Sequence, residues 1–108
     1  MENKSLIKLI PNKIQVGGQD INISFVKSIE GGVLGHCVLC KGLIEIADEA
    51  YGYTQTNDSK FNTFIHECIH TILDTMGNKD LSENEEFVST FSGFTTEIIR
   101  NIMNNKNK

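Results

Sequence analysis

The spacing of the apolar residues changes near the middle of this 108-residue chain. Over the first half, apolar residues alternate with polar ones, as they do in strands with one buried face. From Phe61 onwards they recur at steps of three and four residues, which is the spacing of an amphipathic helix. A chain of this length forms one domain. The sequence therefore predicts a single α+β domain over residues 1–108, in which a small sheet of about four strands precedes two main helices.

The predicted sheet consists of two β-hairpins. Residues 14–16 and 21–26 alternate apolar and polar side chains around Gly17 and Gly18, which are typical turn residues. Residues 34–40 and 43–47 form a second pair of apolar, β-compatible segments. Hairpins that follow one another in this way predict a small, mostly antiparallel sheet.

Each predicted helix has one apolar stripe. The stripe of the first helix contains Phe61, Ile65, Cys68, Ile72 and Met76. Gly77 follows at the position where a glycine commonly ends a helix. The second helix is expected to start near Asp80 or Ser82 and to run to about Met103. Its stripe contains Phe87, Phe91, Phe94 and Ile98.

The first helix carries the run His66-Glu67-Cys68-Ile69-His70. Its histidines are four residues apart, so both imidazoles lie on one helix face and can bind one metal ion. Glu67 is offset by one residue, so it flanks the ion and can accept a proton from a metal-bound water. Zn²⁺ with three protein ligands lowers the pKa of its water to about 7. The motif predicts a catalytic zinc site; the alternative is two surface histidines beside a solvated glutamate.

The third metal ligand is expected from the acidic cluster at the start of the second helix. Glu85 shares a helix face with Val88 and Ser92, which suits a carboxylate that points inward between helices. Ser82 and Glu85 also match the capping-box pattern, and a helix that begins at Ser82 would engage Glu85 in its cap. Glu85 is therefore the preferred ligand in a site with two histidines and one glutamate, and Glu86 is the alternative.

These segments resemble a known family. Residues 64–73, followed by Asn84-Glu85-Glu86-Phe87-Val88, look like the small phage and prophage-type metallopeptidases. Those proteins are similar to the ImmA/IrrE and SprT-like zinc peptidase domains. The resemblance covers residues 12–102, although only the helix motif and the later glutamate are specific.

The resemblance implies a gluzincin-like arrangement, in which His66, His70 and a downstream glutamate bind Zn²⁺ and Glu67 is the catalytic base. Gluzincins also carry the pattern Glu-x-x-x-Asp, and here Ser89 stands where that aspartate would be. Other residues must therefore orient the imidazoles of the two histidines. Asp74, one turn beyond His70, is a candidate, and the alternative is that Asp74 is merely exposed near the helix end.

Composition narrows the expected function. The net charge of −4 argues against a nucleic-acid-binding surface, and no apolar stretch approaches the ~20 residues that cross a bilayer. Three cysteines are typical of free thiols in a reducing compartment, so a cytoplasmic location is expected. Cys37 and Cys40 lack a second metal-binding pair and are interpreted as small apolar strand residues. Residues 1–11 and 104–108 are expected to be a flexible lead-in and tail.

The function predicted from these features is zinc-dependent hydrolysis of a peptide bond in a protein or peptide substrate. Tyr51 and Tyr53, just before the first helix, could donate a hydrogen bond to an oxyanion, or could simply cover the core. One alternative is a zinc-binding regulatory or interaction module of phage or prophage origin without turnover. Another is a phage accessory protein without metal. The sequence makes no prediction of the oligomeric state.

Overall fold

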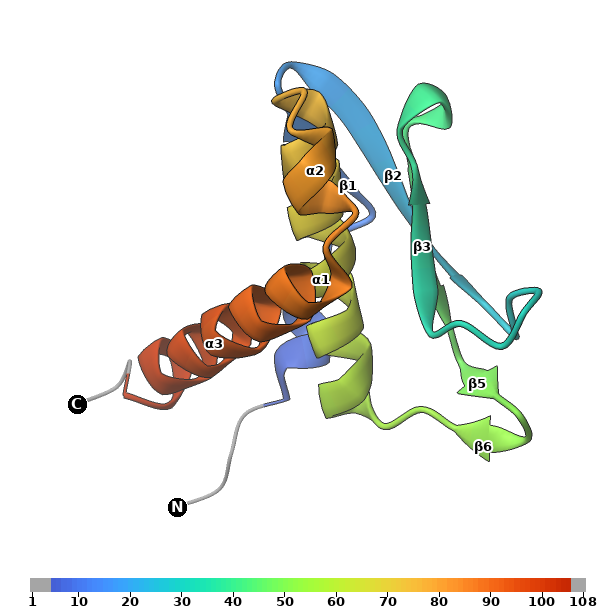
Figure 1. Cartoon of the computed structure of the whole chain (residues 1–108). Helices are drawn as coiled ribbons and strands as arrows, with labels where there is room; N and C mark the ends of the chain where they lie inside the picture. Colours follow the sequence, from blue (N-terminus) through green and yellow to red (C-terminus); the bar gives the residue numbers. More distant parts are fainter. Residues whose placement is uncertain (1–4, 106–108) are drawn as a thin grey trace.

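The computed structural model describes residues 5–105, which form an α+β fold (Figure 1). The strands are β1 (Lys13–Val16), β2 (Gln19–Val26), β3 (Gly35–Val38), β4 (Leu43–Ala47), β5 (Glu49–Ala50) and β6 (Tyr53–Thr54). The α-helices are α1 (Asn57–Thr75), α2 (Lys79–Ser82) and α3 (Glu85–Asn104), and the 3₁₀ helices are η1 (Leu6–Leu9) and η2 (Leu39–Lys41). The predicted fold class, with a sheet of four strands followed by two main helices, is confirmed.

The main sheet has the strand order β1-β2-β4-β3, and β5 and β6 form a separate hairpin. β1 pairs with β2, and β3 pairs with β4, in the two antiparallel hairpins that the sequence predicts. The first hairpin turns at Gly17 and Gly18, whose φ angles of 60° and 84° are left-handed and therefore suit glycine.

The sheet is mixed, because β2 and β4 are parallel neighbours. After β2, residues 27–34 lead to β3, which lies at the edge of the sheet. β4 then runs between β2 and β3. The alternation of apolar residues identifies the partners within a hairpin. It does not show which strand of the second hairpin will lie against the first, and the expected antiparallel contact is therefore replaced by a parallel one.

The core lies between the sheet and α1. Its buried side chains come from β2, β4, α1 and η1, and they are Ile21, Ile23, Ile44, Ile46, Phe61, Phe64 and Leu6. The sequence predicts a flexible lead-in, whereas Leu6 is only 1% exposed and packs in this core. Residues 1–4 and 106–108, which belong to the predicted lead-in and tail, lie outside the described residues.

α1 begins with a cap and a buried anchor. Thr56 is the N-cap, and its hydroxyl accepts a hydrogen bond from the backbone N–H of Ser59 at 3.1 Å. The buried Gln55 donates from Nε2 to the carbonyl of Ala47 at 2.6 Å. Its Oε1 accepts from the hydroxyls of Ser59 and Thr63, each at 2.7 Å. This network ties the first turn of α1 to the end of β4 and fixes the position of the helix along the sheet.

α1 is covered on two sides, which a single apolar stripe does not describe. The predicted stripe is wrong at its C-terminal end, where Ile72 is 44% exposed and Met76 is 68% exposed. The side of α1 that faces the sheet is buried instead. On the other side, Ile69 and Leu73 are buried against Val88 of α3. The predicted stripe lies between the face of α1 that contacts the sheet and the face that contacts α3. Its C-terminal residues therefore stay exposed.

The apolar stripe predicted for the second helix does not face the interior. Phe91, Phe94 and Ile98 are more than half exposed. The buried residues of α3 are smaller, and they are Val88, Ser92 and Thr96. Small side chains at a helix crossing let the two axes approach closely, which explains why this face packs against α1. Although α3 is long and exposes apolar residues, no helix within residues 5–105 is apolar enough to cross a membrane.

The second predicted helix is divided in two. α2 ends at Ser82, and α3 starts at Glu85 with a new cap. The cap is Asn84, whose side-chain oxygen accepts a hydrogen bond from the backbone N–H of Phe87 at 3.0 Å. The long helix therefore starts later than the predicted Asp80 or Ser82. Because Asn84 supplies the cap, the carboxylate of Glu85 can turn toward α1.

Candidate metal centre

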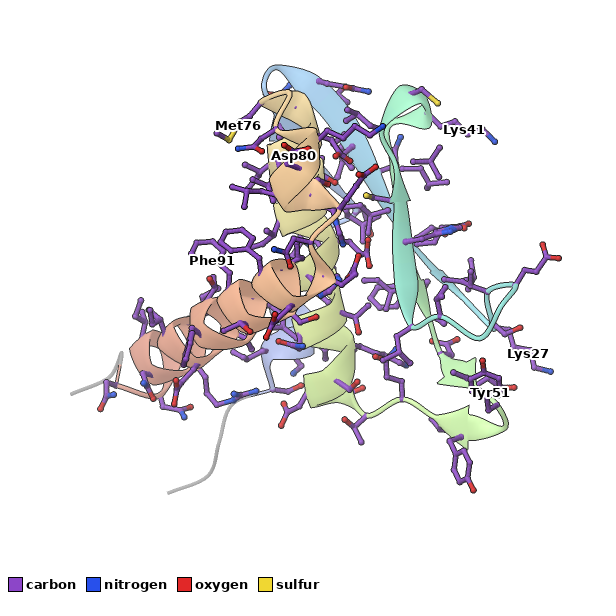
Figure 2. All side chains as sticks on the ribbon, in the orientation of Figure 1. Lys27, Lys41, Tyr51, Met76, Asp80 and Phe91 are labelled. Carbon is purple, nitrogen blue, oxygen red and sulfur yellow. The ribbon has the colours of Figure 1, made fainter. Side chains whose placement is uncertain are left out.

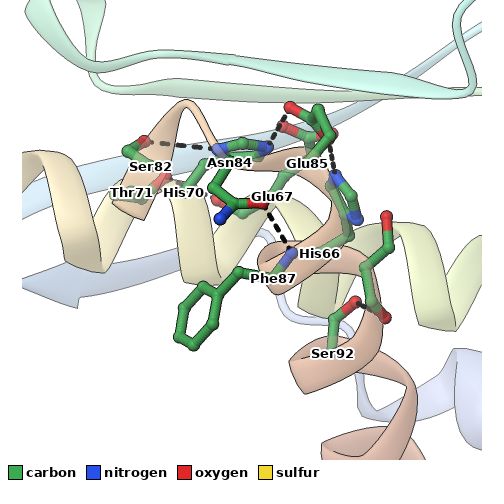
Figure 3. A network of polar contacts seen from close by, with 10 residues as sticks. His66, Glu67, His70, Thr71, Ser82, Asn84, Glu85, Phe87 and Ser92 are labelled. Atoms are coloured by element: carbon green, nitrogen blue, oxygen red, sulfur yellow. Dashed lines mark hydrogen bonds and ion pairs between the residues drawn. The ribbon is translucent and has the colours of Figure 1, made fainter. Parts of the chain in front are cut away.

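Two imidazoles and one carboxylate meet where α1 passes the first turn of α3 (Figure 3). Nε2 of His66 lies 3.2 Å from Oε1 of Glu85, and Nε2 of His70 lies 3.1 Å from Oε2 of Glu85. The imidazole centroids are 4.9 Å apart, as expected for residues separated by one helical turn. The structure thus brings together the three residues that the sequence predicts as metal ligands.

This donor set suits Zn²⁺. Two imidazoles and one carboxylate bind zinc in catalytic sites at about 2.0–2.2 Å, which separates the donors of a tetrahedral ion by about 3.3 Å. The two N–O separations are close to that value, and one donor atom from each residue lies within 4.8 Å of the others. The side chains of His66 and His70 are mostly buried, whereas that of Glu85 is 66% exposed. One side of the site is therefore open to solvent.

The start of α3 places Glu85, and not Glu86, beside the two histidines. Glu85 occupies the first turn of the helix, on the face whose next residues are the buried Val88 and Ser92. Glu86 is rotated by one position around the helix. Of the two, only Glu85 lines the cleft beside the histidines. The face that the sequence assigns to Glu85 is the face that packs against α1.

Ser82 orients one of the histidines. Nδ1 of His70 lies 3.3 Å from the hydroxyl of Ser82, which is buried. A hydrogen bond at one ring nitrogen fixes the direction of the other, so Ser82 holds Nε2 of His70 toward Glu85. Asp74 has no hydrogen bond or ion pair with either histidine within residues 5–105. The sequence gives no indication that Ser82 contacts His70, because α2 is needed to bring Ser82 back to α1.

The surroundings of His66 favour its neutral form. Burial lowers the pKa of its imidazole, and the nearby His70 lowers it further. The carboxylate of Glu85 acts in the opposite direction, but its effect is smaller. A neutral imidazole keeps the nitrogen lone pair that a metal ligand needs.

Glu67 lies beside these three side chains, on the side of α1 that faces the sheet, and it is 6% exposed. Burial raises the pKa of its carboxyl to about 7, although the charge of His70 and a hydrogen bond with Cys37 lower it. A general base is most effective when its pKa lies near the working pH. Glu67 therefore has the proton affinity of a base that works near neutrality.

Gly35 allows β3 to cover Glu67. A Cβ atom at residue 35 would lie 2.5 Å from Cγ2 of Thr63 and 3.4 Å from Cγ of Glu67. The strand can approach α1 this closely only because glycine has no side chain. The close approach removes water from the carboxylate, and this desolvation is the main cause of its raised pKa.

We expect Glu67 to make the metal-free protein less stable as the pH rises. The pKa of its carboxyl is about 7 in the fold and 4.5 in its ordinary state, so the folded chain binds the proton more tightly. Stability is therefore lost between these two pH values, by about 3 kcal/mol at about 1.4 kcal/mol per pKa unit. Glu67→Gln cannot ionise and should not show this loss. Urea denaturation of both chelator-treated proteins at about pH 5 and about pH 8 measures the difference, and an equal pH dependence would contradict it.

A cleft of about 660 Å³ runs past the site between β3 and the helices. Residues 32–37 form one wall, and α1 and α3 form the other. β3 is an edge strand of the sheet, so within the described residues its outer backbone groups have no partner strand. An extended peptide can pair with such an edge.

The two tyrosines singled out in the sequence, and the remaining histidine, His36, lie outside the group of converging side chains. Tyr51 and Tyr53 are 81% and 80% exposed, and neither lines the cleft. The hydroxyl of Tyr51 donates to the carbonyl of Gly31 at 3.1 Å. His36 lines the cleft, but its Nε2 lies 2.6 Å from Oε1 of Glu45 on the neighbouring strand. Neither tyrosine is therefore placed to bind an oxyanion at the metal centre.

The three cysteines are free thiols. Cys37 lines the cleft and packs against the core, and burial raises the pKa of its thiol to about 11. Burial likewise raises the pKa of Cys68 to about 12. β3 ends at Val38, so Cys40 lies in η2 and is exposed. The interpretation of Cys40 as an apolar strand residue is therefore wrong.

A comparison of this chain with protein-family models gives no match, and neither curated proteins nor solved structures give one. The resemblance to prophage-type metallopeptidases therefore rests on the sequence motifs alone.

Proposed function

We propose that this protein is a zinc-dependent metallopeptidase that hydrolyses a peptide bond in a protein or peptide substrate. The observation that carries the proposal is the convergence of His66, His70 and Glu85, with the buried Glu67 beside them in the wall of an open cleft. Zn²⁺ held by these three ligands supplies a Lewis acid, which acidifies water and polarises a carbonyl group. The open side of the site gives access to both water and substrate.

Glu67 moves the protons in this reaction. Its carboxylate takes a proton from the attacking water and delivers it to the leaving amine. A pKa near 7 suits both steps, because the group can be deprotonated before the attack and protonated after it. β3 supports this role by keeping Glu67 away from bulk water.

An extended peptide along β3 is the proposed mode of substrate binding. The free edge of β3 offers backbone hydrogen bonds that do not depend on the substrate sequence. Val33 and Leu34 line the same wall of the cleft, and each is 44% exposed. These two side chains favour a substrate with an apolar residue next to the scissile bond.

A second candidate is a zinc-binding regulatory or interaction module of phage or prophage origin, without turnover. One observation favours it: within the described residues, no tyrosine, lysine or arginine lines the cleft. Stabilisation of an oxyanion would then depend on the metal and on amide or hydroxyl groups. In such a module the metal serves to hold α1 and α3 together, and chelation is expected to unfold the protein.

The thiols support a reducing, cytoplasmic location as part of this proposal. Cys37, Cys40 and Cys68 are all free in the structure. Disulfides are common in oxidising compartments and rare in the cytosol. An exposed free thiol such as Cys40 is best tolerated where reductants are abundant.

Zinc content tests the proposed metal centre. Wild-type protein is expected to contain about one zinc per chain by elemental analysis, whereas His70→Ala is expected to contain almost none. His36→Ala is the matched control, because it removes the remaining histidine, which pairs with Glu45 and not with Glu85. A wild type that holds no zinc after incubation with the metal would refute the proposal, as would equal losses in the two variants.

A further inference from the structure

We propose that α3 mediates self-association, by antiparallel pairing with α3 of a second copy of this chain. The surface is a row of apolar side chains along the helix, here called the outer stripe. It consists of Phe87, Phe91, Phe94, Ile98 and Ile102. The metal centre uses a different face of the same helix, so the two surfaces do not compete.

The outer stripe is exposed along most of α3. Phe91, Phe94, Ile98 and Ile102 are 51%, 62%, 59% and 61% exposed. Phe87 is half-buried and stacks on Phe91, with ring centroids 5.7 Å apart. Figure 1 shows the C-terminal half of α3 projecting from the fold, and Figure 2 shows Phe91 on the side of α1 opposite to β3.

The outer stripe forms an apolar patch of the size that is often functional. Side chains of this kind that are more than half exposed present on the order of 100 Å² each, so the four contribute about 400 Å². Contiguous apolar patches of about 300–600 Å² on monomers are often functional. A standard interface buries about 800 Å² per partner, and the helix backbone and flanking side chains add to the area of the stripe.

The spacing of the row is that of a helix–helix seam. The steps from Phe87 to Ile98 are four, three and four residues, as at the a and d positions of a coiled coil. Of the positions that flank the row, Thr90, Thr95 and Asn101 are uncharged, and Glu97 carries a charge. Charged residues are depleted from the centres of protein interfaces, whereas a solvated helix face commonly carries them.

The row is self-complementary when the second helix runs in the opposite direction. A twofold axis next to Phe94 places Phe91 opposite the partner's Ile98 and Phe87 opposite the partner's Ile102. The layers on either side of the axis then combine a large aromatic side chain with a smaller aliphatic one, which fills space well, and the two Phe94 side chains meet at the centre. A parallel pair would instead place Phe opposite Phe and Ile opposite Ile, which fills the layers unevenly.

The charges along the helix agree with this direction. Glu85 and Glu86 lie in its first turn, so a parallel pair would place four acidic groups side by side, whereas an antiparallel pair separates them. Antiparallel helices also place opposite ends of their dipoles side by side. A second copy is therefore a better occupant of the outer stripe than an unrelated helix, because the required size and charge pattern is already present in this chain.

Sedimentation equilibrium of the full chain tests the proposal. In the micromolar range the wild type is expected to have twice the chain mass of 12.1 kDa, and Phe94→Glu to have the mass of one chain. Tyr53→Glu is the matched control, because it places the same charge at an aromatic residue that is 80% exposed on β6, and it should remain dimeric. A wild type with the mass of one chain, or a dimeric Phe94→Glu that is folded by circular dichroism, would overturn the proposal.

Cross-linking tests the direction of the helices without disturbing the interface by a charge. Phe91→Cys and Ile98→Cys are introduced into separate chains that also carry Cys40→Ser, which removes the exposed native thiol. The two variants are mixed in the presence of oxidised glutathione. Antiparallel pairing predicts disulfides between the two different variants. Disulfides within each variant, or none at all, would contradict it.

Discussion

Replacement of Glu67 by glutamine is expected to reduce peptide hydrolysis by about a thousandfold, within the 10²–10⁴-fold range of general acid–base catalysis. The amide cannot accept the proton of the attacking water. It has nearly the size of the carboxylate, so the packing of residue 67 against β3 is retained. Glu67 is not among the three converging ligands, and the zinc content should therefore be unchanged. Turnover of an extended peptide and elemental analysis of the same sample measure both quantities.

The matched control for this prediction is Glu83→Gln. Glu83 is an exposed glutamate whose side chain pairs with Lys79 at 3.6 Å, and it does not line the cleft. The activity of Glu83→Gln should therefore equal that of the wild type. Full activity of Glu67→Gln would show that another group is the base. A wild type that holds zinc but cleaves no peptide would favour the regulatory module over the peptidase.

The affinity for zinc is expected to fall by at least about a hundredfold in Glu85→Ala, because loss of a ligand exceeds the 10–100-fold effect of outer-shell partners. Glu86→Ala removes the same charge one position along the helix, where the side chain does not line the cleft. Its affinity should remain close to that of the wild type. Competition with a chromophoric chelator at neutral pH measures the two affinities.

The comparison of neighbouring residues separates ligation from general attraction. Equal losses in Glu85→Ala and Glu86→Ala would show that the acidic cluster attracts the cation without a specific ligand. A larger loss in Glu86→Ala would assign the ligand role to Glu86 and imply that the first turn of α3 rotates when the metal binds. Only a selective loss in Glu85→Ala agrees with the geometry described here.

Local patterns in the sequence predict much of the fold. The turn at Gly17 and Gly18, the second hairpin and the helical register of His66 and His70 all depend on residues a few positions apart. Such features follow from backbone geometry and from the period of the apolar residues. They could therefore be identified before any tertiary contact was known.

The features that the sequence does not predict depend on contacts between distant segments. The parallel pairing of β2 with β4 follows from how two hairpins dock. The inward face of α3 carries Val88 and Ser92 in place of the larger Phe91 and Phe94, because close packing of two helices favours small residues. Periodicity shows that a helix has an apolar stripe, but not whether that stripe meets its own core or another molecule.

In the candidate site, too, the features set by nearby residues are predicted and those set by distant contacts are not. The sequence predicts the three side chains that converge, since the motif and the start of α3 lie within a short stretch of chain. It gives no indication that Gly35 lets β3 cover Glu67, or that Ser82 reaches His70. Both depend on distances across the fold. These two contacts affect the pKa of Glu67 and the orientation of the His70 ring. They do not change which residues form the candidate site.

The short separation of the ligands along the chain has a consequence for the order of folding. His66 and Glu85 are 19 residues apart, and most of the chain between them is helical. Closing such a segment costs little chain entropy, and contacts between near residues form faster than those between distant ones. The sheet is assembled more slowly, because β4 must insert between β2 and β3. The proposed zinc site would therefore form in the helical half of a nascent chain, before the sheet is complete.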